Sequence, residues 1–255
     1  MRMNDMTPVK VRNITVGEGK PVICVPVVGT DKESIIRDAA DILHSPADLM
    51  EWRADWFHDV NDINAVLDVL QTLRETVGEL PVLMTFRTKA EGGEREISAD
   101  AYAELCITAA KSGLVDLIDA ELFSPKAVDI IQGVHEAGIP IIVSNHDFEK
   151  TPDTQELMRR LRLMDLLGGD ILKIAVMPKS RKDVLTLLEV TEEMSSVCTK
   201  PLVTMAMSGL GTITRISGEI FGSALTFGTV SKASAPGQMA ADRLKEILDA
   251  LHEAL

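Results

Sequence analysis

Short, almost continuously apolar runs recur along the chain, and longer segments with helical spacing of apolar residues separate them. Each run has the length of a strand and is bounded by glycine, proline or polar residues. Runs that are apolar on both faces are typical of parallel strands covered by helices. The predicted strands span residues 22–29, 48–55, 81–87, 114–122, 139–148, 170–178, 201–208 and 223–230.

The intervening segments carry apolar residues every three or four positions, which predicts amphipathic helices. One such stripe consists of Val60, Ile63, Leu67, Leu70, Leu73 and Val77. Further helices are predicted to begin at Ser98, to begin at 151–153, and to span 180–197 and 238–255. Eight strand and helix units in a chain of this length predict an α/β fold, a single (β/α)8 TIM barrel spanning residues 1–255.

Two features refine this prediction. Val11, Ile14 and Val16 alternate with polar residues before a Gly-Glu-Gly turn, so a short β-hairpin is expected over about 9–19, ahead of the barrel. The alternative fold is a doubly wound open sheet. It is disfavoured because no G-x-G-x-x-G turn follows the first predicted strand.

Composition narrows the class of protein. The chain has 255 residues, a net charge of −13, and no apolar run long enough to span a bilayer. Such a charge repels nucleic acid and anionic membranes, so neither is an expected partner. The three cysteines have no metal or disulfide spacing, and the first residues do not resemble a signal peptide. We therefore expect a cytoplasmic protein.

One charged residue lies inside an apolar run. Lys173 is in the middle of 170–178, which follows two glycines and ends at Pro178. An ammonium group in apolar surroundings loses hydration, which is expected to lower its pKa from roughly 10.4 towards neutrality. A neutral amine is a nucleophile for a carbonyl carbon. The alternative interpretation is a lysine that reaches the rim or pairs with a carboxylate.

Polar residues gather where the predicted strands end, which is the edge that holds the active site of a TIM barrel. They include Glu51, Arg53, Asp55, Arg87, Glu91, His146, Arg215, Lys232, Ser234 and Gln238. Arginine forks suit a carboxylate or hydroxyl groups, and an acidic protein needs such a local positive cluster to attract an anion. This grouping indicates a small polar substrate.

His146 is the candidate proton-transfer partner of Lys173. An ordinary imidazole pKa near 6.5 allows it to act as acid and base. Glu91, in the loop after Arg87, is a candidate to orient that imidazole. Each also has a structural interpretation, His146 near a helix start and Glu91 as a loop acid. Asp119 and Glu121 are either an inner polar layer or a salt-bridged rim.

Several motifs in this order resemble type I 3-dehydroquinate dehydratases, over nearly the whole chain. They are Leu-Met-Glu-Trp-Arg at 49–53, Thr-Phe-Arg at 85–87 with Glu-Gly-Gly-Glu at 91–94, Ser-Asn-His-Asp-Phe at 144–148, Lys-Ile-Ala-Val-Met-Pro at 173–178, Thr-Arg at 214–215 and Ala-Ser-Ala-Pro-Gly-Gln at 233–238. No single motif is enough to indicate this family, but the whole set in this order is highly specific for it.

The resemblance implies a TIM barrel that is a homodimer, needs no metal or organic cofactor, and has 3-dehydroquinate as its small-molecule substrate. By this resemblance Lys173 forms an imine with the substrate ketone. His146 removes the neighbouring proton and protonates the departing hydroxyl, a syn elimination giving 3-dehydroshikimate. Glu91 matches the partner of this histidine. The matching substrate-binding positions are Glu51, Trp52, Arg53, Arg87, Arg215, Ser234 and Gln238.

The chain departs from the family pattern at Pro26, where relatives often carry a substrate-contacting serine, and at Leu172, which is often proline. The glycine-rich stretch 208–211 is a candidate lid. Other interpretations are a class I aldolase acting on a phosphorylated sugar, a metal-dependent lyase using Glu51, Asp55, Asp119 and His146, and an inactive barrel that serves as a binding module.

Overall fold

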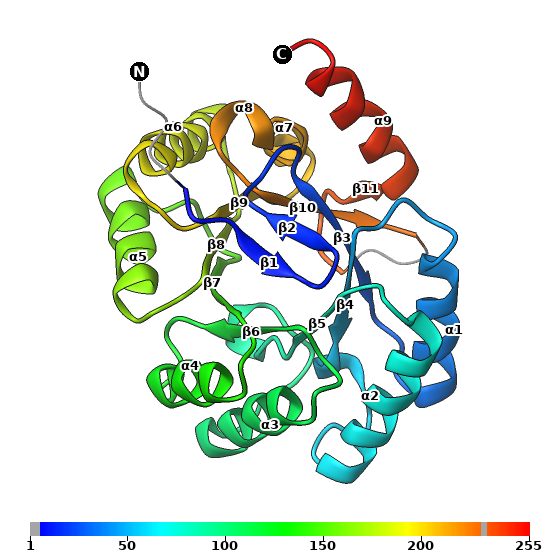
Figure 1. The fold of residues 1–255 in the computed structure, drawn as a ribbon. Helices are drawn as coiled ribbons and strands as arrows, with labels where there is room; N and C mark the ends of the chain where they lie inside the picture. Colours follow the sequence, from blue (N-terminus) through cyan, green and yellow to red (C-terminus); the bar gives the residue numbers. More distant parts are fainter. Residues whose placement is uncertain (1–5, 231–233) are drawn as a thin grey trace.

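The protein, seen in a computed structural model, is described over residues 6–230 and 234–255, so the predicted rim residue Lys232 lies outside the described residues. Eight parallel strands follow one another around a barrel (Figure 1). They are β3 (Val22–Val27), β4 (Leu49–Arg53), β5 (Val82–Thr85), β6 (Leu117–Glu121), β7 (Ile141–Asp147), β8 (Ile171–Val176), β9 (Leu202–Ala206) and β10 (Leu225–Thr229).

The barrel closes between β9 and β10. A parallel bridge joins Leu202 to Ser223, and the backbone N–H of Ala224 donates to the carbonyl oxygen of Leu202 at 2.7 Å. The Ser223 hydroxyl group also accepts from the backbone N–H of Thr204 at 3.0 Å. The TIM-barrel prediction is therefore confirmed, and the open-sheet alternative is wrong.

Helices surround the barrel in Figure 1. They are α1 (Lys32–Ile42), α2 (Ile63–Val77), α3 (Ala99–Lys111), α4 (Ala127–Glu136), α5 (Thr154–Leu166), α6 (Arg181–Val197), α7 (Thr212–Ile216), α8 (Gly218–Phe221) and α9 (Ala241–His252). Short 3-10 turns follow three strands: η1 (Ala54–Trp56), η2 (Lys89–Glu91) and η3 (Gly209–Gly211). Ser98, Asp153 and Ser180 cap α3, α5 and α6, because each side chain accepts a backbone N–H of the first turn.

The predicted start of the last helix at residue 238 is wrong. Met239 and Ala240 form a short strand, β11 (Met239–Ala240), which pairs in parallel with Gly228 and Thr229 of β10. The helix begins only at Ala241. This added strand holds the preceding residue, Gln238, at the carboxyl end of β10.

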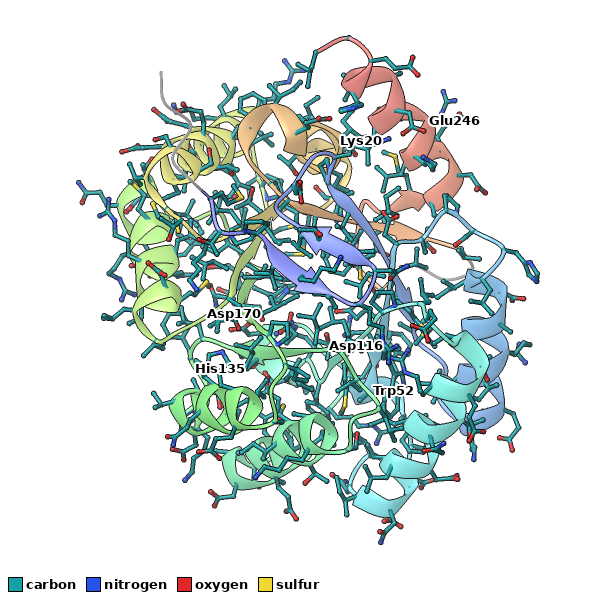
Figure 2. The ribbon with its side chains drawn as sticks, in the orientation of Figure 1. Lys20, Trp52, Asp116, His135, Asp170 and Glu246 are labelled. Atoms are coloured by element: carbon teal, nitrogen blue, oxygen red, sulfur yellow. The ribbon has the colours of Figure 1, made fainter. Side chains whose placement is uncertain are left out.

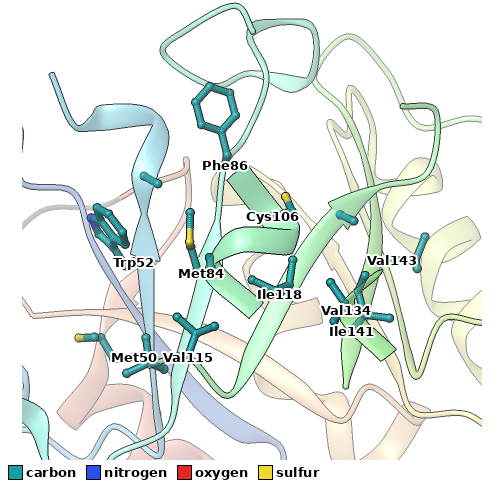
Figure 3. Close-up of a cluster of buried hydrophobic side chains, with 14 of the residues drawn as sticks. Met50, Trp52, Met84, Phe86, Cys106, Val115, Ile118, Val134, Ile141 and Val143 are labelled. Carbon is teal, nitrogen blue, oxygen red and sulfur yellow. The ribbon is translucent and has the colours of Figure 1, made fainter. Parts of the chain in front are cut away.

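Side chains alternate between the inside of the barrel and the layer under the helices, as the two-residue period of a strand requires. Inside, every strand of the barrel contributes to a compact apolar cluster, which includes Val22, Cys24, Leu49, Leu83, Leu117, Ile142, Ile171, Val203 and Leu225. Outside, a larger apolar core packs against the helices (Figure 3). Above the inner cluster, towards the carboxyl ends of the strands, the inward positions become polar.

The opposite end of the barrel is covered by the predicted hairpin, β1 (Val9–Val11) and β2 (Ile14–Val16), which lies across the barrel in Figure 1. Its buried residues Val11 and Val16 pack on the inner apolar cluster. Arg12 between the strands donates to Asp116 at 2.6 Å. Asp116 and Asp170 lie at this end of the molecule (Figure 2).

Aspartates that precede alternate strands connect the backbone at this end. Asp48, Asp116 and Asp170 each accept a backbone N–H from the start of the preceding strand, at Ile23, Val82 and Ile141, with distances of 2.8–2.9 Å. Charge-assisted hydrogen bonds of this kind stabilise the amino-terminal end of the barrel, which lies opposite the end where TIM barrels carry their active sites.

Candidate active site

A pocket of about 480 Å³ opens at the carboxyl ends of the barrel strands. It brings together nine of the ten residues predicted from the sequence, which come from six different strands or the loops after them. These are Glu51, Arg53, Arg87, Glu91, His146, Lys173, Arg215, Ser234 and Gln238. Residues separated by up to 187 positions in the chain therefore face one cavity.

Trp52 is the exception. It lies between Glu51 and Arg53 on β4, so the alternation of the strand directs its side chain away from the pocket. Its ring is fully buried in the outer core (Figures 2 and 3). The centre of the ring lies 6.1 Å from that of Phe57. The expected substrate contact of Trp52 is therefore replaced by a packing role.

Lys173 projects from β8 into the pocket and is almost completely buried. Its Nζ donates to Asp119 Oδ2 at 2.8 Å and lies 4.8 Å from the centre of the Phe227 ring. Asp119 also accepts from Arg87 at 2.7 Å and from the Ser144 hydroxyl group at 2.5 Å. The lysine is thus both paired with a carboxylate and turned towards the cavity, so the two sequence interpretations are not exclusive.

Glu91 and His146 form a second pair in the pocket. Glu91 Oε2 lies 3.0 Å from His146 Nδ1 and 2.8 Å from the backbone nitrogen of His146. Gly92 and Gly93 let the chain turn sharply after Glu91. A side chain at Gly92, whose φ is +84°, would meet the ring of Phe148, and one at Gly93 would meet the carbonyl oxygen of Arg87.

Burial and charge set the protonation of this pair. Burial raises the pKa of Glu91 to about 7, against the opposing effect of Arg87. Burial lowers the pKa of His146 well below its usual value, and the positive charges of Arg87 and Lys173 lower it further. The pKa of Asp119 is held far below its usual value by Arg87 and Lys173, which outweigh its burial. His146 is therefore neutral at pH 7 and able to accept a proton.

Arg53 and Glu51 line the side of the pocket formed by β4. Arg53 binds Asp55 in a bidentate pair, with both N–O distances at 2.8 Å. Asp55 also accepts the backbone N–H of Arg87 at 3.2 Å, which joins the ends of β4 and β5. Glu51 Oε1 accepts from the Thr85 hydroxyl group at 2.8 Å.

Arg215 differs from the other cations of the pocket. Its side chain is almost fully buried, and within residues 6–230 and 234–255 it has no carboxylate partner. It donates to the carbonyl oxygen of Pro236 at 3.0 Å and approaches Met205 Sδ at 4.0 Å. Burial without a compensating anion lowers the pKa of Arg215 to about 10. A guanidinium group in this state is suited to an anionic ligand.

Ser234 and Gln238 stand beside Arg215. Gln238 accepts the backbone N–H of Ser234 at 2.9 Å through Oε1, and donates to the Ser234 hydroxyl group at 3.1 Å through Nε2. The loop that holds them packs closely on Ser208. Gly237 lies so near the Ser208 carbonyl group that any side chain at position 237 would clash with it. The proposed lid 208–211 is thus in contact with this loop, and its motion stays a prediction.

The structure adds residues that the sequence motifs did not single out as pocket walls: Thr85, Gly92, Phe148, Ala175, Phe227 and Ala235. Met205 and Met207, which the sequence indicates as core or pocket wall, line the pocket too. Several could have been found from strand alternation, since Thr85, Ala175 and Phe227 lie two positions from a predicted site residue or an inner apolar residue. Of the carboxylates in the metal-lyase interpretation, Asp55 and Asp119 are bound to cations. The described residues contain no cluster of His, Cys, Asp or Glu arranged as metal ligands.

Comparison with known proteins decides the family. The model of the type I 3-dehydroquinase family matches residues 23–254. The chain belongs to the type I 3-dehydroquinate dehydratase family. A 3-dehydroquinate dehydratase of Clostridioides difficile is 47% identical over 250 residues, covering 97% of this chain and 98% of that protein.

Similar solved structures belong to the same family. A crystal structure of type I 3-dehydroquinate dehydratase from Clostridium difficile, described with covalently modified comenic acid, has a TM-score of 0.95 at 47% identity. It covers 98% of this chain, and this chain covers all of it. The enzyme from Geobacillus kaustophilus gives a TM-score of 0.94 at 40% identity, with 97% of each chain covered. The resemblance predicted from the motifs is confirmed, and the protein is a hydro-lyase of the shikimate pathway. No helix in the described parts of the chain could cross a membrane.

Proposed function

We propose that this dehydratase removes water from 3-dehydroquinate through an imine formed with Lys173. The observation that carries the proposal is the position of Nζ, buried in the same pocket as the His146 imidazole. Attack on the ketone requires the unprotonated amine, so the lysine first gives a proton to His146. His146 then returns this proton to the carbinolamine oxygen, which leaves as water, and a C=N bond to the enzyme remains.

The elimination follows from the imine. When protonated, the C=N group withdraws electrons and acidifies the C–H bond on the neighbouring carbon. His146 removes this proton, and the electron pair forms an enamine. The C–O bond of the departing hydroxyl group then breaks as His146 returns the proton to it, so one molecule of water leaves on one face, a syn elimination. Hydrolysis of the imine releases 3-dehydroshikimate and restores Lys173.

Glu91 orients the base in this scheme. An ionised Glu91 accepts the proton of Nδ1, which leaves the Nε2 lone pair of His146 free to act on the substrate. Arg215, with Ser234 and Gln238, holds the substrate carboxylate. Glu51, Arg53 and Arg87 contact the ring hydroxyl groups or order the residues that do so.

We also propose that the enzyme is a cytoplasmic homodimer that needs no metal or organic cofactor. Family membership supports this state. Light scattering on the purified protein is expected to give about twice the chain mass of 27.8 kDa. Activity is expected to survive exhaustive treatment with a chelator. A monomer, or activity that returns only with added metal, would contradict this part of the proposal.

The decisive experiment is reduction with borohydride in the presence of 3-dehydroquinate, followed by peptide mass spectrometry. We expect irreversible inactivation and a single adduct on Lys173. The Lys173→Ala variant is expected to give no adduct and no turnover. A phosphorylated sugar, as the substrate of a class I aldolase, is expected to leave the enzyme unmodified. An inactivated enzyme with an unmodified Lys173 would refute the imine assignment.

A further inference from the structure

A line of hydrogen bonds runs from the active site to the surface of α5. Glu91 Oε1, the carboxylate oxygen not used by His146, accepts from Asn145 Nδ2 at 2.8 Å. The amide oxygen of Asn145 accepts from Arg160 Nη1 at 2.6 Å. Arg160 Nε in turn donates to Glu156 Oε1 at 2.7 Å. None of Asn145, Arg160 and Glu156 lines the substrate pocket.

Asn145 is a polar residue in an apolar position. It alternates with Ser144 and His146 on β7, so its side chain points out of the barrel and towards α5. Its outward-facing neighbours Val143 and Ile174 belong to the outer core. A buried amide in such a layer requires partners for both ends, and here it has one partner at each end.

The guanidinium group of Arg160 decides which way this amide faces. Arginine offers only donors, so the amide oxygen must point to Arg160 and the NH2 group must point to Glu91. A flipped amide would set NH2 against guanidinium and oxygen against carboxylate. Arg160 is itself held in place, by Glu156, by Asp147 Oδ2 at 3.7 Å and by the Phe123 ring at 5.6 Å from its carbon Cζ.

We propose that Arg160 and Asn145 are positioning residues that fix the rotation and the ionised state of the Glu91 carboxylate, and through it the tautomer of His146. This deepens the proposed function and rests on it. With Oε1 held by Asn145, Oε2 faces both the backbone N–H and Nδ1 of His146. Outer residues that orient a reactive group are often nearly as important as the group itself.

The hydrogen bond from Asn145 also favours the ionised form of Glu91. Burial raises the pKa of Glu91, and the Asn145 donor is one of the contacts that oppose this. The charged groups that face Glu91 and His146 are Arg53, Arg87, Asp119, Glu121 and Lys173. Arg160 is a further charge nearby and pairs with Asp147, next to His146, so Arg160→Met changes the charges as well as the hydrogen bonds. Asn145→Ala removes no charge, so a change in its pH profile reports the hydrogen bond to Glu91.

The test compares Asn145→Ala and Arg160→Met with Arg159→Met. Arg159 is a matched control because it neighbours Arg160 on α5 and binds the same Glu156, at 2.6 and 2.9 Å, but is exposed and does not contact Asn145. Loss of one charge-assisted hydrogen bond is expected to lower kcat about tenfold at pH 7 in both test variants. KM is expected to change little, and Arg159→Met is expected to match the wild type.

The pH profile separates positioning from a structural role. A Glu91 that protonates more readily moves the acid limb of kcat/KM to higher pH, so the loss of activity is expected to shrink as pH rises. Arg160→Lys keeps one donor and is expected to recover part of kcat. The double variant is expected to lose little more than the more impaired single variant, because both act through Glu91.

Borohydride trapping tells the two proposals apart. Adduct formation on Lys173 is expected in wild type and in both variants, which also shows that each variant folds. No adduct in the wild type overturns the proposed function itself. If the wild type gives the adduct but the variants keep the wild-type kcat and pH profile, the positioning role is wrong. A loss of kcat that is equal at all pH values, together with a lowered Tm, overturns it as well.

Discussion

At the scale of single residues, the site combines cations that are already neutralised with one that is not. Arg53, Arg87 and Lys173 each bind carboxylates of the protein, whereas in the described residues the Arg215 guanidinium group contacts a carbonyl oxygen and a sulfur. Its Nε is buried and has no partner in the same region. A charge in this state lowers the stability of the empty protein and favours binding of an anion.

Arg215→Met tests this balance. Removal of the guanidinium group is expected to raise KM for 3-dehydroquinate about tenfold or more, because a hydrogen-bonded ion contact is lost. The free energy of unfolding is expected to stay the same or rise, since an unpaired buried charge is removed. Steady-state kinetics and urea unfolding measure the two effects. Arg162→Met, an exposed change on α5, is the control. A large loss of stability without a change in KM would show that Arg215 is structural.

His146→Ala separates the two chemical stages. Lys173 remains in place, so the imine is expected to form, although more slowly because His146 no longer takes up the lysine proton, and nothing then removes the proton on the neighbouring carbon. We expect a borohydride adduct that lacks only the ketone oxygen lost in imine formation and still carries the hydroxyl group that would be eliminated, with turnover lowered by at least about a hundredfold, within the usual range for a lost general base. Mass spectrometry of the trapped protein measures this. An adduct that also lacks this hydroxyl group would show that another group removes the proton.

At the scale of elements, alternation along the strands explains most of the site. Glu51 and Arg53 face the cavity and Trp52 between them faces the core, just as Ser144 and His146 face inwards while Asn145 faces α5. The motifs predicted the residues, but a match to a motif does not say which side of a strand each residue occupies. Trp52 was misplaced for this reason.

Trp52→Phe makes the distinction measurable. Loss of the indole from a fully buried position leaves a partly empty space, which is expected to cost about 1–3 kcal/mol of unfolding free energy. KM for the substrate is expected to remain near the wild-type value. Chemical denaturation and kinetics on the same preparation check both. A raised KM with unchanged stability would return Trp52 to the list of substrate contacts.

At the end of the barrel that the β1–β2 hairpin covers, we predict a substitution that lowers stability without changing activity. Asp116 accepts from Arg12 at 2.6 Å, from Arg74 at 2.5 Å and from the backbone of Val82 at 2.8 Å. Asp116→Ala leaves these donors without their acceptor and is expected to cost about 2–3 kcal/mol, while kcat stays unchanged because the pocket is at the other end. Asp68→Ala, which removes an exposed pair with Lys32, is expected to cost less than about 1 kcal/mol.

At the scale of the whole molecule, the sequence was sufficient for the fold and for most of the polar residues that line the pocket. Strand-length apolar runs gave eight barrel strands, and Lys173 stood out because it is charged within one of them. The sequence did not show which distant segments of the chain contact one another. The closure at Leu202 and Ser223, the short strand β11 and the contact of Arg160 with Asn145 each depend on which segments meet in space. Local patterns do not encode that information residue by residue.

The site also lowers the stability of the fold, and Glu91 shows by how much. Its pKa is raised from 4.5 to about 7 in the folded protein. Between these values the folded state holds a proton that the unfolded state has released, so stability falls as pH rises from about 4.5 through 7. A shift of this size corresponds to roughly 3 kcal/mol at pH 8. Full ionisation of Glu91, which the proposed orientation of His146 requires, therefore costs folding free energy.

Glu91→Gln removes the titration and isolates this cost. The difference in unfolding free energy between variant and wild type is expected to shift in favour of the variant by roughly 3 kcal/mol between pH 5 and pH 8. Turnover is expected to fall, because a neutral amide no longer favours the Nδ1–H tautomer of His146. Denaturant unfolding across this pH range measures the shift, with Glu149→Gln, an exposed change on the following loop, as control. A difference that stays constant with pH would mean that Glu91 has the same pKa in the folded and the unfolded protein. Ionisation of Glu91 would then cost no folding free energy.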